Sequence, residues 1–461
     1  MLNEQAIQSF QSSLRGKLVQ PGDADYDAVR ALYNGMIDKR PRLIARCVDV
    51  ADAIAAVSFG RDQGLLVAIR GGGHNGPGLG SCNDGLMIDL SLMKGVRVDP
   101  ASRTVRVDAG CTSGDVDHAT HPFGLAVPFG IVSTTGVAGL TLGGGTGYLT
   151  RQYGLTIDNL LEADVVLADG SFATASKSQH PDLFWALRGG GGNFGVVTSF
   201  LFQAHPVSTV YAGPIFWEAT HAKAVMRAYR DFLANAPEEL GAFVGLKTVP
   251  PMDPFPKDYW GRRACAVISS YNGAAAEGEK VMAKLLKSVP PPIFNWMGAM
   301  PFPAIQGLFD PFFPKGLQWY WKGDFVKSLP DEAIDAHIAQ AAEAPTDLSL
   351  MHLYPIDGAV RRVPGDATAW NTRDATWSMV IAGIGSDPKR ADALKTWGRA
   401  YWKAVHRFNL EGGYLNFMMD DEADGRVQAT YGENYKRLAS VKAKYDPKNL
   451  FRVNQNIRPA A

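Results

Sequence analysis

Short apolar runs alternate with glycine-rich turns between about residues 38 and 208. Residues 41–48 are typical of a strand, and Asp49 can cap a helix whose apolar positions follow helical spacing until Gly64. The continuous apolar run at 65–69 is typical of a strand that is buried on both faces. The pattern therefore predicts a β-α-β unit whose second strand leads directly into a glycine loop at 70–76.

Two further stretches alternate apolar and polar residues in the manner of β-hairpins. The first joins residues 96–98 to 104–107 through an Asp-Pro turn. The second joins residues 162–168 to 171–175 through an Asp-Gly turn, which is favoured in hairpins. Both hairpins fall in the glycine-rich part of the chain.

From about residue 209 to 410 the glycine runs stop and aromatic residues become frequent, which predicts an α+β domain. Its expected strands and helices are 265–271, 348–354 and 376–384, and 222–235, 275–286, 331–342 and 389–408. The last fifty residues read as a loop-and-helix segment. The predicted division is a helical lead-in at 1–37, a glycine-rich domain at 38–208, an α+β domain at 209–410 and a C-terminal segment at 411–461.

Charge and cysteine content narrow the class of protein. The 461 residues include 46 basic and 46 acidic side chains, and this zero balance argues against a general nucleic-acid binder. No stretch approaches the ~18 apolar residues of a spanning helix, and no secretory signal is visible. The four cysteines form no CxxC pair. We therefore expect a soluble, cytoplasmic protein with reduced thiols and no membrane or nucleic-acid partner.

Glycine is the compositional outlier, with 49 residues, and much of it gathers in three loops at 70–80, 136–147 and 189–195. Such loops make tight turns, and their successive backbone N–H groups can also cradle phosphate oxygens. Three of them in one domain favour an extended phosphate-bearing ligand such as a dinucleotide. The GxGxxG at 190–195 is not a Rossmann fingerprint, because a helix is predicted before it and a strand after it.

His74 is the strongest single candidate for a reactive or cofactor-binding residue. It lies in a glycine loop at the carboxyl end of a buried strand, where α/β units place their ligands. It is either a nucleophile or ligand for a bound cofactor, or a solvated loop histidine. His118 and His121 have helical spacing but lack a third metal ligand, so no metal site is predicted.

Four motifs in order carry a family resemblance: RGGGHN at 70–75, GIVSTTGVAGLTLGGGTGYLTRQYGLTIDNL at 130–160, DLFWALRGGGGNFGVVTSF at 182–200, and a tail with YLNF at 414–417 and YGENYKRLASVKAKYDPKNLFRVNQNI at 431–457. Together they resemble the FAD-linked oxidases of the vanillyl-alcohol oxidase superfamily. Within it they are similar to the berberine-bridge-enzyme-like branch, which includes bacterial hydroxynicotine oxidase.

The resemblance implies an α+β, two-lobed fold. An FAD-binding domain of the PCMH type would come from 38–208 with the C-terminal segment, and a substrate-binding domain with an antiparallel sheet from 209–410. In the family, the histidine at the position of His74 is bonded to the 8α-methyl of the flavin. The cysteine that makes a second link in many relatives is Val132 here, so we predict FAD with a single covalent link.

The resemblance also implies cofactor contacts along the glycine loops and the tail. These are Arg70, Gly71, Gly72, Gly73, His74, Asn75, Thr135, Gly136, Gly139, Gly143, Gly147, Asn193, Gly195, Val196, Asn454 and Asn456.

The implied reaction moves a hydride to flavin N5 from a C–H that bears OH or NH, on a sugar, alcohol or secondary metabolite. O2 then reoxidises the flavin and gives H2O2. A flavin dehydrogenase that uses a quinone or another acceptor is an alternative, and a non-catalytic flavin-binding scaffold is a second one. Relatives of similar motif content oxidise different compounds, so the motifs leave the substrate open.

Tyr414 resembles the tyrosine proposed as the base in alcohol-oxidising relatives, with Asn416 as a partner for its phenolate. It could equally be a wall residue, and the second tyrosine that some relatives carry is Thr146 here. His352 and Tyr354 lie two apart on a predicted strand and therefore share one face. That face is either a floor over the flavin or the packed side of the sheet.

Overall fold

Four short strands near the N-terminus lead into the first glycine loop. In the computed structural model, which describes residues 3–422 and 424–460, their sheet order is β1 (Lys17–Val19), β2 (Leu43–Arg46), β4 (Leu86–Asp89) and β3 (Val67–Arg70). β2 and β3 both run parallel to β4, and helix α3 (Val50–Asp62) connects β2 to β3. This confirms the predicted β-α-β unit. The segment predicted as a helical lead-in differs, because between α1 (Glu4–Ser13) and α2 (Tyr26–Arg30) it also provides β1, which pairs with β2.

A five-stranded antiparallel sheet packs beside it and contains both predicted hairpins. Its order is β5 (Val96–Asp99), β6 (Thr104–Asp108), β10 (Val196–Gln203), β8 (Leu160–Val166) and β9 (Phe172–Ser176). The helices between these strands are α4 (Ser113–Thr120), α5 (Val137–Leu142), α6 (Thr150–Tyr153) and α7 (Pro181–Leu187). Helix α7 precedes the GGGGNFG loop and β10 follows it, as predicted, so this loop has the reverse of Rossmann order.

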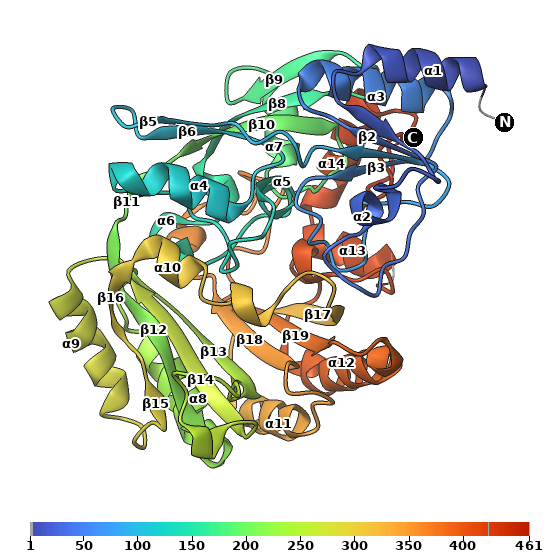
Figure 1. The fold of residues 1–461 in the computed structure, drawn as a ribbon. Coiled ribbons are helices and arrows are strands. Elements are labelled where there is room, and N and C mark those ends of the chain that lie inside the picture. Colours follow the sequence, from blue (N-terminus) through green and yellow to red (C-terminus); the bar gives the residue numbers. More distant parts are fainter. Residues whose placement is uncertain (1–2, 423, 461) are drawn as a thin grey trace.

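The middle of the chain builds an antiparallel sheet of longer strands. Its order is β15 (Phe294–Asn295), β12 (Thr209–Glu218), β14 (Arg263–Tyr271), β13 (Leu240–Thr248), β18 (Leu350–Pro355), β19 (Trp377–Gly385) and β17 (Gln318–Val326), with β16 (Gly298–Pro301) also on β12. One face is covered by α8 (Ala222–Leu233), α9 (Ala275–Leu286), α11 (Asp331–Ala342) and α12 (Ala391–Val405). The other face turns toward the glycine-rich lobe (Figure 1) and shares a core with it and with α10 (Phe302–Gln306). The predicted α+β fold with an antiparallel sheet is confirmed.

The C-terminal segment returns to the first lobe. Helices α13 (Asp424–Tyr431) and α14 (Asn434–Tyr445) follow this antiparallel sheet in sequence, yet α14 packs against α7, and both chain ends lie beside the first lobe (Figure 1). The loop at 414–417 is thereby carried between the two lobes. Within the described residues, every helix is too short or too polar to cross a membrane.

Candidate active site

A cavity of about 350 Å³ opens where the two lobes meet. Its wall combines the glycine loops, the inner face of β17, β18 and β19, and two C-terminal stretches at 414–417 and 453–455. Most of the predicted site residues lie on this wall: Arg70, Gly71, Gly72, Gly73, His74, Asn75, Thr135, Gly136, Gly139, Gly143, Asn193, Gly195, His352, Tyr354, Tyr414, Asn416 and Asn454.

Two of the glycine loops touch through bare backbone. A Cβ on Gly72 would lie 2.4 Å from Gly136 Cα, and a Cβ on Gly136 would lie 2.3 Å from the Gly72 nitrogen, so a side chain at either position would separate the loops. Gly139 and Gly192 also line the cavity, but a Cβ on them would meet nothing within 4 Å. The loops therefore pack tightly against each other and leave open backbone toward the cavity, which fits a long phosphate-bearing cofactor.

His74 is held on the cavity wall by two neighbours. Its ring stacks on Tyr33 with the ring centroids 3.8 Å apart, and its Nε2 lies 3.1 Å from Thr134 Oγ1. Burial lowers the pKa of His74 to about 4, so the imidazole is neutral near pH 7. Tyr33 is placed here because its backbone N–H donates to the Gly73 carbonyl at 3.1 Å. No motif or periodicity singles out Tyr33, which lies in the segment predicted as a lead-in.

The side chain of Arg70 is engaged within its own sheet. Its Nε donates to Asp89 Oδ1 at 2.9 Å, and its other nitrogens bond to Asp89 Oδ2 and the Val29 carbonyl. This follows from the parallel register, which places Arg70 opposite Asp89 on β4. Arg70 therefore lines the cavity with its guanidinium already engaged by Asp89 and Val29, so its predicted contact with the cofactor would come from its backbone. Asn75 closes the same loop, because its Oδ1 accepts from the Leu79 backbone at 2.8 Å.

Asn193 and Asn454 tie the C-terminal tail to the third glycine loop. The Asn193 amide donates to the Gln455 carbonyl at 3.2 Å, and its Oδ1 accepts from the Ile457 N–H at 3.0 Å. The Asn454 amide donates to the Gly192 carbonyl at 3.0 Å. Asn454 Oδ1 is buried and has no hydrogen-bond partner among the described residues, and Asn454 lines the cavity. An orphaned acceptor at this position fits a cofactor with N–H or O–H groups.

Tyr414 is fixed by two hydrogen bonds to its phenol oxygen. The Asn416 amide donates at 2.7 Å and the Gly145 backbone N–H at 3.0 Å, and both bonds favour the phenolate. Burial opposes them and raises the pKa of Tyr414 to about 12. The Asn416 amide also donates to the Leu140 carbonyl at 3.1 Å. Gly143 leaves the room for this, because a Cβ there would lie 2.1 Å from Asn416 Oδ1.

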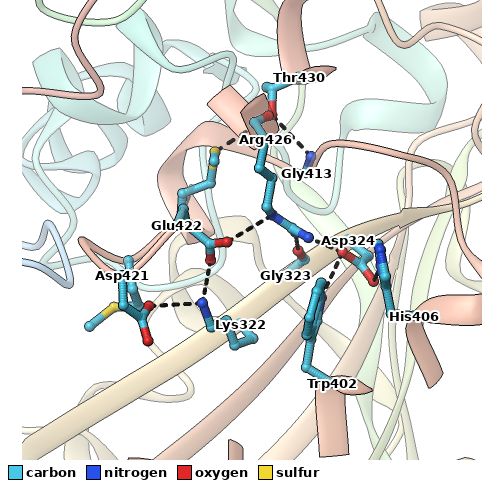
Figure 2. Close-up of polar contacts among 12 residues, drawn as sticks. Lys322, Gly323, Asp324, Trp402, His406, Gly413, Asp421, Glu422, Arg426 and Thr430 are labelled. Carbon is cyan, nitrogen blue, oxygen red and sulfur yellow. Dashed lines mark hydrogen bonds and ion pairs between the residues drawn. The ribbon is translucent and has the colours of Figure 1, made fainter. Parts of the chain in front are cut away.

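The loop that carries Tyr414 is clamped to β17 (Figure 2). Arg426 on α13 donates to the Gly323 carbonyl and, at 2.7 Å, to Asp324 Oδ1. Thr430, one turn further along α13, accepts the Gly413 N–H at 3.1 Å. Gly413, the residue before Tyr414, is thus bonded to the same helix that Arg426 ties to β17.

The same clamp continues as a charged network around Lys322 (Figure 2). Its Nζ lies 2.8 Å from Asp421 Oδ1 and 2.7 Å from Glu422 Oε1, and Glu422 in turn lies 2.9 Å from Arg426 Nε. The Lys322, Glu422 and Arg426 side chains are largely buried, so each charge depends on its partner.

His352 and Tyr354 share one face of β18, as predicted, and this face turns to the cavity. His352 Nδ1 lies 2.7 Å from the Tyr354 hydroxyl, and burial raises the pKa of Tyr354. The imidazole lies across Gly245 on the neighbouring strand, where a Cβ would come within 2.5 Å of its Cδ2. Both alternatives for this face hold in part, because the same residues pack on the sheet and line the cavity.

Three predicted cofactor contacts lie away from the cavity wall: Gly147, Val196 and Asn456. A Cβ on Gly147 would lie 1.9 Å from the Phe129 carbonyl, so this glycine serves chain packing. Val196 is fully buried in β10. Besides Tyr33, several wall residues that motifs did not single out are hydrophobic and come from the long antiparallel sheet and the segment before β17: Phe309, Phe313, Trp319, Trp321, Leu350, Val380 and Ala382.

Two lobes with glycine loops, a histidine and a buried tyrosine around one cavity form the arrangement expected of a flavin-dependent oxidoreductase. The family description "FAD binding domain" matches residues 41–176, and "Berberine and berberine like" matches 413–458. An FAD-linked oxidoreductase of Dictyostelium discoideum is 30% identical over 460 residues, covering 99% of this chain and 97% of the relative.

Two further comparisons agree. The (R)-6-hydroxynicotine oxidase of Paenarthrobacter nicotinovorans is 29% identical, covering 97% of each chain. The crystal structure of 6-hydroxy-D-nicotine oxidase from Arthrobacter nicotinovorans has a TM-score of 0.87 at 27% identity, covering 97% of this chain and 99% of that one. The chain therefore belongs to the FAD-linked oxidoreductases of the berberine-like family, which confirms the resemblance seen in its motifs.

Proposed function

We propose that this FAD-linked oxidoreductase is an oxidase with covalently bound flavin. Its substrate is a sugar, alcohol or secondary metabolite with a C–H that bears OH or NH. The observation that carries the proposal is that His74 and the Tyr414–Asn416 pair lie on the wall of one cavity. When bound, FAD accepts the hydride at N5 and passes the electrons to O2, which gives H2O2.

His74 is the proposed point of attachment. With the ring proton on Nε2, the imidazole donates to Thr134 and leaves the Nδ1 lone pair free to bond to the flavin 8α carbon. Attachment would form this N–C bond at the expense of one 8α C–H and the imidazole proton, and O2 would take up the two electrons and two protons as H2O2. Val132 lines the same cavity and offers no thiol, while Cys111 is fully buried elsewhere, where burial raises its pKa to about 12. A single link follows.

Tyr414 is the proposed proton acceptor. Its oxygen is already held by two donors, so loss of its proton to solvent or to a neighbour is assisted by Asn416 and by Gly145. His352 and Tyr354, on the face of β18 that lines the cavity, bind and orient the substrate. The cavity wall among the described residues is mostly hydrophobic, which excludes water around these groups.

The test supplies the purified protein under air with a panel of sugars, alcohols and cyclic amines, and measures H2O2 and substrate loss. The proposal predicts equal amounts of the two for at least one compound. Turnover that requires an added quinone, with little peroxide, would assign a dehydrogenase instead. If no panel compound bleaches the flavin without oxygen, the enzymatic proposal for these substrate classes is wrong.

A further inference from the structure

Lys247, near the end of β13, is a buried lysine without a counter-ion. Its side chain is on the inner face of the long antiparallel sheet and only 9% of the residue is exposed. Within residues 3–422 and 424–460 it makes no hydrogen bond or ion pair. The other buried lysines differ, because Lys322 lies 2.8 Å from Asp421 and Lys442 lies 2.6 Å from Asp446.

Aromatic rings surround the Lys247 ammonium. Its Nζ lies 5.3 Å from the ring centroid of Phe309, 5.8 Å from Phe216 and 5.9 Å from Phe312. Such ring faces attract a cation but do not neutralise it. Burial lowers the pKa of Lys247 to about 8, which leaves a substantial charged fraction at neutral pH. An uncompensated charge is costly in a fold, and here it lies directly behind the cavity residue Phe309.

His352 lies beside this charge, and one of its two ring nitrogens also lacks a partner. Lys247 and Gly245 share one face of β13, and His352 of β18 lies across Gly245. Its Nε2 is buried and unpartnered in the described chain, whereas its Nδ1 is 2.7 Å from the Tyr354 hydroxyl. Burial and the positive charge of Lys247 lower the pKa of His352, so the ring is neutral. When Tyr354 donates to Nδ1, the Nε2–H is a donor that lacks an acceptor.

Acidic side chains are absent from the described cavity wall, and its one arginine, Arg70, is paired with Asp89. The cavity thus has an uncompensated cation behind one end and an unsatisfied N–H donor beside it, with no carboxylate to repel a negative ligand. These features complement an anionic oxygen.

We propose that Lys247 and His352 recognise an anionic oxygen on the substrate, either a carboxylate or an ionised phenol. Lys247 attracts that oxygen electrostatically from behind His352 and Phe309, and the unsatisfied Nε2–H of His352, which is turned toward Gly245, adds to the positive potential at this part of the wall. The inference rests on the proposed function only in taking this cavity as the substrate site. It narrows the substrate to an acidic member of the proposed classes.

Calorimetric titration of the purified flavoprotein with benzoate and with benzamide, its neutral counterpart, tests the proposal. Benzoate is expected to bind about tenfold tighter than benzamide, as for one positive charge placed behind the wall that meets the carboxylate. Lys247→Met is expected to abolish this preference and leave benzamide affinity unchanged, and Lys247→Arg to retain it. A melting temperature and flavin content equal to wild type show that each variant is folded.

Two results would overturn the inference. One is benzoate that binds no tighter than benzamide, which includes no binding of either. The other is Lys247→Met that weakens both compounds equally or neither. The titration measures binding and does not require turnover. A protein that prefers benzoate but forms no peroxide with any substrate would therefore contradict the oxidase proposal and still support this inference.

Discussion

The side-chain amide of Asn416 donates a 2.7 Å hydrogen bond to the phenol oxygen of Tyr414. The two residues are only two positions apart in the chain. The Gly145 backbone N–H, from the first lobe, donates to the same phenol oxygen at 3.0 Å. Two donors from different parts of the chain thus converge on one buried oxygen. Burial alone would make Tyr414 a poor base, so the two bonds decide how near to neutral pH it can act.

Asn416→Ala is expected to move the pH profile of substrate-driven flavin reduction to higher pH, because it removes a bond that stabilises the phenolate. Tyr414→Phe is expected to lower the rate constant by about 10²–10⁴-fold, the usual contribution of a general base. Both are measured by stopped-flow absorbance across pH. A Tyr414→Phe variant that retains the wild-type rate would assign Tyr414 to the wall.

Tyr33→Leu is expected to slow covalent attachment of the flavin. The stacked ring holds the His74 imidazole in place, and such ring pairs contribute about 0.5–1.5 kcal/mol, which corresponds to roughly a two- to tenfold effect. Tyr33→Phe is the matched control, because it keeps the ring and loses only the hydroxyl that donates to the Phe313 carbonyl. Flavin fluorescence of the denatured protein on a gel measures the linked fraction. Equal labelling of both variants would exclude a positioning role.

Asp117 predicts a pH dependence of stability. Burial in α4 raises its pKa to about 7, and its Oδ1 and Gln306 Oε1 both lack partners in the described structure, although Gln306 donates to Asp117 Oδ2 at 3.4 Å. A raised pKa means that the folded protein keeps a proton that the unfolded chain loses near pH 4. This group therefore lowers stability progressively from about pH 4 to 7.

Asp117→Asn removes this ionisation and can pair with Gln306 amide to amide. We expect its gain in melting temperature over wild type to be small at pH 5 and larger at pH 8. Melting curves of the two proteins across this range provide the check. A difference that does not change with pH would show that Asp117 is not protonated in the folded state.

Arg426→Met is expected to destabilise the protein by about 1–3 kcal/mol, because it removes one buried partner each from Asp324 and Glu422, which keep His406 and Lys322. Arg399→Met is a matched control, since Arg399 pairs with Asp421 but its side chain is 55% exposed, and such pairs contribute about 0–1 kcal/mol. Denaturant unfolding measures both. If the Arg426 contacts also position Tyr414, Arg426→Met lowers kcat at a temperature at which the variant is still folded. Arg426→Lys, assayed at the same temperature, is then expected to recover part of that kcat with KM little changed. Equal effects of the two Met variants would contradict this account.

The sequence predicted the loops and most elements well because their signals are local. The helices at 275–286 and 331–342 coincide with α9 and α11, and the RGGGHN loop leaves β3 as the apolar run implies. Period-two alternation correctly predicts that His352 and Tyr354 share one face of the strand. It does not predict which part of the protein packs against that face. That face borders the cavity only because the first lobe packs over it, which is a long-range outcome.

The remainder of the site depends on contacts between segments far apart in sequence. Tyr33 reaches His74 through a backbone bond to Gly73, which has no periodic signature. The arginine of RGGGHN has a motif position, but its orientation is decided by Asp89 on the adjacent strand. Lys247 reads as an ordinary strand-end lysine, and only the packing of three phenylalanines around it reveals a buried charge.

The most direct test of the account is the mass of the intact polypeptide under denaturing conditions, for wild type and His74→Ala. The account predicts that wild type carries the added mass of one FAD, located by peptide mapping on the peptide that contains His74. His74→Ala is predicted to have the mass of the bare polypeptide and to release its flavin into acid supernatant. Wild-type protein at the bare mass, or flavin that stays attached in His74→Ala, would contradict the covalent link.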